Sequence, residues 1–140
     1  MRASAHHSIR KLLAVIAAIV ALGVLVPVAS AGTQKPFHLE KVCDTGTHCV
    51  VITSNFAAIP AGSEINYTGP DVDHLVPVLT IKNGSATGQC AIGSIFGDPS
   101  TPGTCVLAAG TGRLTQFHLD AAVTFDGASW FWDGWYWFGN

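Results

Sequence analysis

The sequence predicts an all-β domain whose sheet closes on itself. Short runs rich in β-branched and aromatic residues alternate with turn residues, and no amphipathic helical pattern follows residue 32. The 140 residues are 49% hydrophobic and only 11% charged, which excludes a disordered chain. Eight short strands would leave two exposed edges in a flat sheet, so we expect closure into a barrel or a sandwich.

The first 31 residues predict a cleavable signal peptide rather than part of the fold. Three basic residues precede an uncharged apolar run over residues 12–26, and Pro27 ends this run. The run is shorter than the roughly 20 residues that a membrane-spanning helix needs. Ala29-Ser30-Ala31 provides the small residues that a signal peptidase accepts, so the mature chain would begin at Gly32. The alternative is an uncleaved N-terminal anchor.

Residues 32–140 would then form the single domain of a secreted, extracellular protein. No later segment approaches transmembrane length, so no membrane association is expected after cleavage. Four basic residues against nine acidic ones give this part a net charge of −5. Because nucleic-acid-binding domains normally carry clustered cations, this charge argues against a nucleic-acid partner.

Four cysteines in an exported small domain predict two disulfides. We favour Cys43–Cys49 and Cys90–Cys105 among the three pairings, because each pair flanks a turn-rich stretch. A zinc site is the alternative, but the sequence contains no Cys-x-x-Cys spacing, so no metal is expected.

The expected strands, in chain order, are residues 37–43, 49–54, 64–68, 75–82, 86–92, 105–108, 113–125 and 130–138. Turn residues lie between them, and the most specific signal is Asn83-Gly84, typical of a two-residue hairpin. Residues 113–125 alternate between apolar and polar positions, which indicates one buried face. An immunoglobulin-like sandwich is disfavoured, because all four tryptophans follow the last cysteine instead of lying between distant cysteines.

The last run, residues 130–138, is apolar on both faces except at Asp133 and Gly134. We expect one strand with a local bulge or kink at Gly134, because the arms of a hairpin turning there would be too short to be stable. If alternation survives Gly134, one face carries Trp130, Trp132, Tyr136 and Phe138.

Segments near the C-terminus resemble the allene oxide cyclase-like and dirigent-like barrel families, and most of all small exported bacterial members. These segments are Gly103 to Leu114, which holds a Gly-Thr-Gly turn, then Phe117-His118, Trp132-Asp133-Gly134 and Tyr136-Trp137-Phe138. The resemblance covers about residues 48–138. It implies an eight-stranded antiparallel β-barrel with a central cavity, assembled as a homo-oligomer, either a trimer or a dimer.

Members of these families isomerise a fatty-acid epoxide or steer phenolic intermediates inside the cavity. The Glu, the Asn-held water and the Pro of the plant cyclases have no matching motif positions in this sequence. The resemblance therefore implies a fold and a cavity but no catalytic residue, and no cofactor is expected.

The candidate ligand-binding residues are Asp133, Trp130, Trp132 and Tyr136. Tryptophan offers a large flat face and one N–H donor to an apolar or aromatic ligand. An acid among tryptophans loses hydration, which favours its protonated form and would let it donate a proton. The alternatives are that the aromatic rings form the core and a subunit interface, and that Asp133 only accepts backbone hydrogen bonds near Gly134.

Two other patterns are weaker. Gly110-Thr111-Gly112 lacks the third glycine and the helix of a dinucleotide site, so turn glycines are the better interpretation. His118 and Asp120 project the same way from one strand, but without a third ligand they indicate a solvated outer face.

Three functional hypotheses remain. The first is a secreted barrel that binds a small apolar or aromatic molecule in its cavity. The second is an isomerase or cyclase that acts on such a ligand, which buried acids in the cavity would favour. The third is a non-catalytic cell-surface interaction module, which a filled interior would favour.

Overall fold

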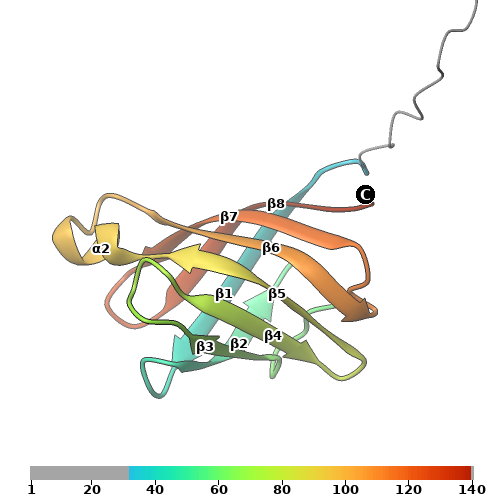
Figure 1. Ribbon diagram of the computed structural model, residues 1–140, viewed down its shortest axis with the longest axis horizontal. Helices are drawn as coiled ribbons and strands as arrows, with labels where there is room; N and C mark the ends of the chain where they lie inside the picture. The colour runs from blue at the N-terminus through green and yellow to red at the C-terminus, as the bar shows by residue number, and fades with distance from the viewer. Residues whose placement is uncertain (1–31, 140) are drawn as a thin grey trace, which may run out of the picture.

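Eight antiparallel strands close into a barrel in the computed structural model, which describes residues 32–139 (Figure 1). The predicted all-β, eight-stranded antiparallel barrel is therefore confirmed, while the predicted signal peptide lies outside the described residues. The strands are β1 (Lys35–Cys43), β2 (His48–Ser54), β3 (Glu64–Thr68), β4 (Val76–Ile81), β5 (Gly84–Ala91), β6 (Gly103–Gly112), β7 (Phe117–Phe125) and β8 (Trp130–Phe138).

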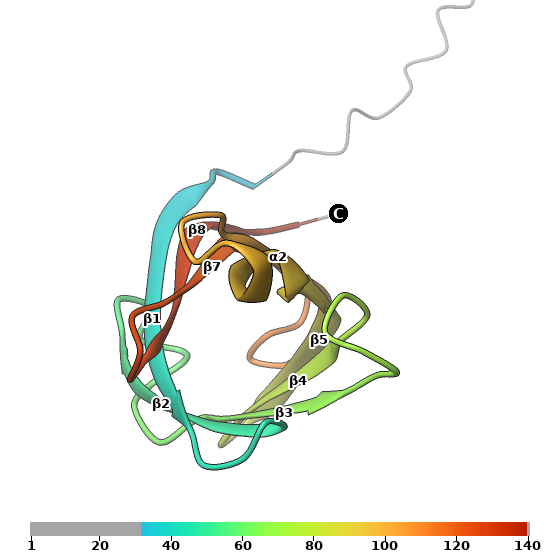
Figure 2. The same ribbon diagram turned by 90° about the vertical axis from the view of Figure 1, so that its left-hand side faces the viewer.

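Each strand pairs with the next one along the chain, and β1 also pairs with β8 to complete the ring. Figure 2 views the barrel end-on and shows β1 beside both β2 and β8. Because closure leaves no free sheet edge, every strand has an inner and an outer face. Alternate residues therefore point into the barrel.

The inner face is apolar and mostly filled. On β7, Phe117, Leu119, Ala121 and Val123 are buried and their neighbours are more exposed, as the alternation predicted. Trp132 of β8 is fully buried and lies in register with Val123 on one side and Leu39 of β1 on the other. Trp132 is therefore part of the apolar core.

Aromatic rings fill the end of the barrel where β8 finishes. Phe56, from the loop after β2, stacks on Tyr136 with ring centroids 4.4 Å apart and on Phe117 at 5.6 Å. Phe138 meets the same rings at 5.6–6.4 Å. The alternation of aromatic residues along β8 therefore continues past Gly134. The inner-facing Tyr136 and Phe138 belong to this aromatic cluster.

The bulge predicted at Gly134 is wrong, although the prediction of a single strand over 130–138 is confirmed. Gly134 pairs with Phe37 of β1 and Ala121 of β7, and the register does not shift there in either pairing. A Cβ atom at this position would collide with the backbone carbonyl of Asp120. Glycine is needed here because β7 and β8 approach closely, not because the strand bends.

The predicted strand over 113–125 is too long at its start. Residues 113–116 form the turn between β6 and β7, in which the Phe117 N–H donates to the carbonyl oxygen of Leu114 at 3.0 Å. Gly112 and Gln116 take positive φ angles of 57° and 61°. Leu114 is fully buried and anchors the turn. Because Gly110-Thr111-Gly112 is the end of β6, the turn comes after these three residues and is not formed by them.

The hairpin predicted at Asn83-Gly84 exists, but its turn lies one residue earlier. Ile81 pairs with Gly84, so Lys82 and Asn83 are the two turn residues and Gly84 begins β5. A side chain at Gly84 would collide with the carbonyl oxygen of Thr111 in β6. Gly84 therefore belongs to the strand because only glycine allows this approach.

The sequence pattern also missed a short helix, α2 (Gly93–Gly97), in the connection from β5 to β6. Five residues are too few to show a helical period, and only Ile95 of this segment is buried. In Figure 2, α2 lies at one side of a mouth of the barrel. No helix within residues 32–139 has the length and hydropathy needed to cross a membrane.

Both disulfides join residues that face each other on adjacent strands. Cys43 is linked to Cys49 across β1 and β2, and Cys90 to Cys105 across β5 and β6. These are the two pairs expected from the turn-rich stretches between them. The described residues contain no free cysteine.

Gly134→Ala should lower the free energy of unfolding by about 1–3 kcal/mol, because backbone atoms of β7 cannot move aside independently. Gly97→Ala is the matched control, since a Cβ at Gly97 meets nothing within 4 Å. Urea unfolding of both variants measures the difference. Equal stabilities would contradict the close approach of β7 and β8.

Candidate functional site

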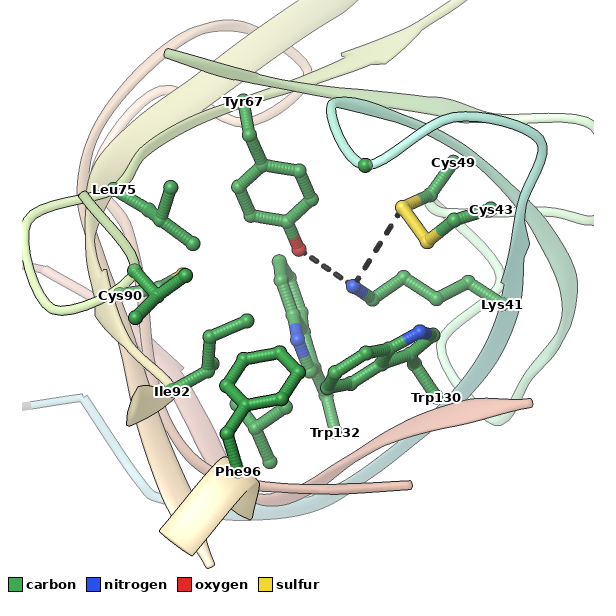
Figure 3. A pocket seen from close by; sticks show the side chains of 13 residues that line it. Lys41, Cys43, Cys49, Tyr67, Leu75, Cys90, Ile92, Phe96, Trp130 and Trp132 are labelled. Atoms are coloured by element: carbon green, nitrogen blue, oxygen red, sulfur yellow. Dashed lines mark hydrogen bonds between the residues drawn. A yellow bond between two sulfur atoms is a disulfide. The ribbon is translucent and has the colours of Figure 1, made fainter. Parts of the chain in front are cut away.

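A cavity of about 210 Å³ occupies the mouth of the barrel next to α2. Its wall combines side chains from strands, from α2 and from the loops between strands, as Figure 3 shows. The lining residues are mostly apolar or aromatic, and they are Lys41, Cys43, Gly46, Cys49, Tyr67, Val72, Leu75, Cys90, Ile92, Phe96, Val123, Trp130 and Trp132. Lys41 is the one formally charged side chain among them.

Lys41 lies inside because β1 alternates. Phe37, Leu39 and Lys41 are all buried, whereas Val42 is exposed. The register between β1 and β2 shifts between Glu40 and Lys41, but the pairing of β1 with β8 continues unbroken to Lys41 opposite Trp130. A strand held on both sides cannot turn one side chain outward, so the lysine stays in the barrel with 3% of its surface exposed.

The Lys41 amine is held by aromatic side chains. Its Nζ donates a hydrogen bond of 2.6 Å to the Tyr67 hydroxyl and lies 4.0 Å from the sulfur of Cys49. It is 4.7 Å from the ring centroid of Tyr67, 5.0 Å from that of Trp132 and 5.8 Å from that of Trp130. Figure 3 shows the amine and the hydroxyl meeting near the centre of the lining.

No carboxylate of the described residues forms an ion pair with this amine. Within residues 32–139, the ion pairs are those of His38, His48 and His74 with aspartates, and none involves Lys41. Burial without a counter-ion disfavours the charged form and lowers the pKa of Lys41 to about 7. Burial likewise raises the pKa of Tyr67, so its phenol remains protonated. Near neutral pH the site therefore holds a protonated phenol beside an amine whose neutral form is accessible.

The cavity wall also contains an unpaired donor. The indole Nε1–H of Trp132 is buried and has no acceptor among the described residues. A buried donor without a partner costs about 1–3 kcal/mol. The lining thus places the amine of Lys41, the hydroxyl of Tyr67 and the indole N–H of Trp132 within a mostly apolar surface.

Phe96 of α2 forms part of the rim and is 65% exposed. Its ring meets that of Trp130 edge-on at a centroid distance of 6.4 Å. Because α2 follows directly from β5, the Cys90–Cys105 disulfide fixes the strands that carry this rim. The Cys43–Cys49 disulfide similarly fixes the wall on the opposite side, beside Lys41.

The four candidate ligand-binding residues from the sequence, Trp130, Trp132, Asp133 and Tyr136, lie in different parts of the barrel. Trp130 and Trp132 line the cavity, whereas Tyr136 packs in the aromatic cluster at the other end of the barrel. Asp133 points outward: its side chain is 55% exposed and its Oδ1 lies 2.6 Å from Nδ1 of His38. The expectation of a buried acid at Asp133 is therefore wrong, because residue 133 falls on the outer face of β8.

The outer face of β8 also holds the remaining aromatic residues of the last strand. Phe131 stacks with His38 and Trp137 stacks with His118, while Trp135 is 52% exposed. The His118 Nε2–H donates a hydrogen bond of 2.8 Å to the carbonyl oxygen of Gly139, and Asp120 is exposed. No cluster of three His, Cys, Asp or Glu side chains that could hold a metal occurs within residues 32–139.

Sequence reasoning missed Lys41 and Tyr67. Both signals were present in the sequence: Lys41 continues the alternation Phe37, Leu39, and Tyr67 follows Ile65 in a five-residue strand. A lysine within an alternating strand is normally assigned to the outer face, because burial of a charge is costly. Continuing the strand pattern through the charged residue would have placed the amine inside.

Comparisons of the chain with protein-family models, with curated proteins and with solved structures found no match.

Lys41→Met should make the protein more stable at neutral pH and should remove a pH dependence. Because the folded-state pKa of about 7 lies below that of an unfolded lysine, the unfolded chain binds more protons between pH 7 and 10. Wild-type stability should thus rise with pH across this window, relative to Lys41→Met, by up to about 1.4 kcal/mol per pH unit. Below pH 7 both states are protonated and the full penalty remains.

Urea unfolding at several pH values measures this effect, with exposed Lys82→Met as the matched control. If wild type and Lys41→Met change in parallel from pH 7 to pH 9.5, the amine is not held in its neutral form.

Proposed function

We propose that the protein binds a small apolar or aromatic molecule in the cavity at the mouth of the barrel. The observation that carries this proposal is the cavity's composition: an aromatic and aliphatic wall around one amine–phenol pair. Ligand sites are commonly apolar surfaces with a few polar groups that fix orientation. Lys41, Tyr67 and Trp132 would supply those groups here.

The size of the cavity limits the ligand. A cavity of about 150 Å³ accepts a benzene ring. The 210 Å³ at this site would accommodate one ring with a short substituent, but neither a long fatty-acid chain nor an oligosaccharide. The preferred ligand class is therefore a single substituted aromatic ring.

This proposal keeps the resemblance to allene oxide cyclase-like and dirigent-like barrels as a hypothesis about ancestry and ligand type. The isomerase alternative relied on a buried acid, and the described cavity lining contains no carboxylate. The interaction-module alternative is favoured by the filled remainder of the barrel and the exposed Trp135. The cavity itself is what favours small-molecule binding over that alternative.

We further propose that the chain is exported, with residues 1–31 as its signal peptide. Two disulfides are consistent with an oxidising, extracellular environment. An extracellular barrel with an apolar pocket is suited to capturing small molecules outside the cell. A homo-oligomer and the absence of a nucleic-acid partner remain part of the same hypothesis.

Wild-type protein should show a higher melting temperature with benzyl alcohol or phenol, and no shift with a long-chain fatty-acid epoxide or an oligosaccharide. Ile92→Trp should fill the cavity and weaken binding of benzyl alcohol by at least about tenfold, or 1.4 kcal/mol. Thermal shift and calorimetric titration measure both effects.

Val78→Trp is the matched control, since Val78 is exposed on β4 and lies outside the cavity lining. It should bind benzyl alcohol as wild type does. Equal weakening in both tryptophan variants, or failure of every aromatic probe to bind wild type, would refute the proposed site.

A further inference from the structure

We propose that Lys41 captures small aromatic aldehydes as a reversible imine, with Tyr67 positioned to transfer the proton that the reaction requires. This inference rests on the proposed binding function and specifies the ligand's reactive group. It is carried by the placement of a single amine inside an apolar cavity, in direct contact with a phenol.

The surroundings of Lys41 favour a role as a nucleophile over a role as the cation of an ion pair. A lysine that serves as a cation is normally paired with a carboxylate, but the described lining offers the amine only aromatic rings, a phenol and disulfide sulfurs. Tyr67 is the one titratable side chain among the described residues that faces it, because Cys43, Cys49 and Cys90 are in disulfides. With its pKa lowered to about 7, the amine carries a free lone pair at neutral pH.

The reaction balances without a cofactor. The neutral Lys41 Nζ attacks the aldehyde carbon and forms a C–N bond, while the carbonyl oxygen takes up a proton. The Tyr67 hydroxyl, 2.6 Å from Nζ, can give a proton to this oxygen and recover one from the nitrogen. In the resulting carbinolamine the C–O bond breaks, the hydroxyl group and the remaining proton on the nitrogen leave as one water molecule, and the C=N bond of the imine forms. Hydrolysis reverses the sequence.

The cavity also suits the imine formed between Lys41 and an aromatic aldehyde. Its volume of about 210 Å³ accepts one aromatic ring, and the rings of Trp130 and Trp132 lie within 6 Å of the amine to pack against it. An apolar wall keeps water away from the imine, which slows its hydrolysis. Exposed lysines of the same chain lack this protection.

The test is reductive trapping of the purified, disulfide-bonded protein with benzaldehyde and sodium cyanoborohydride at pH 7, followed by peptide mass spectrometry. Lys41 should gain one benzyl group at least about tenfold faster than exposed Lys35 and Lys82, since a lysine of ordinary pKa is neutral in only about one molecule in several thousand at this pH. The labelling rate at Lys41 should rise with pH around a midpoint near 7.

Three variants sharpen the result. Lys41→Arg should lose the adduct because guanidinium is not a nucleophile at this pH, and Lys82→Met should label at Lys41 as wild type does. Tyr67→Phe should slow trapping at Lys41 by a larger factor than it weakens binding of benzyl alcohol, which has no carbonyl group to protonate. Circular dichroism and benzyl alcohol binding report whether each variant keeps the barrel and its cavity.

The outcomes separate the two proposals. If benzyl alcohol binds but Lys41 labels no faster than Lys35 and Lys82, aldehyde capture is wrong and the binding function stands. Tighter binding of benzoate than of benzyl alcohol, without an adduct from benzaldehyde, would show that Lys41 serves as a cation instead. If no aromatic probe binds and no adduct forms, both proposals fail.

Discussion

Pairing of β1 with both β2 and β8 is the constraint on which the site depends. A strand at a free edge could twist to release a charged side chain into water, but a strand bonded on both sides keeps its alternation. Lys41 follows Phe37 and Leu39 on that inner face, so closing the barrel buries its amine. The cavity lies where the inner faces of β1 and β8 reach the mouth of the barrel.

Burial of this amine has an energetic cost that the fold does not offset with a counter-ion. The hydrogen bond to Tyr67 and the nearby indole rings stabilise the amine, but burial still lowers the pKa of Lys41 to about 7. A methionine would fill the same space without this penalty. A costly residue in a well-packed barrel is the physical reason to assign Lys41 a function, and the two disulfides beside the cavity help the fold to tolerate it.

The alternation and turn signals of the sequence located all eight strands and predicted closure into a barrel or a sandwich, while the family resemblance implied the barrel. The turn-rich stretches pointed to Cys43–Cys49 and Cys90–Cys105. The errors arose where a tertiary contact decided the local structure. Gly84 and Gly134 look like turn or bulge residues in the sequence, yet each lies in a strand. A side chain at either position would collide with a carbonyl oxygen of the neighbouring strand.

The site was only half predictable for a related reason. Trp130 and Trp132 could be assigned to one face of the last strand, but sequence could not show which end of that strand faces a cavity and which end is filled by Phe56. Asp133 is an acid among tryptophans in the sequence, but alternation places it on the outer face of β8, opposite Trp130 and Trp132. Lys41 and Tyr67 lie 26 residues apart, and only barrel closure brings the amine to the phenol.

The measurement that tests this account most directly is the titration of Lys41 itself. Carbon NMR of the lysine ε-methylene groups, with the Lys41 signal assigned by its loss in Lys41→Met, follows the amine without any ligand or unfolding step. The account predicts a titration midpoint near pH 7, well below those of the exposed lysines. A Lys41 midpoint above pH 10, in the ordinary range of lysine, would contradict the buried neutral amine and the chemistry built on it.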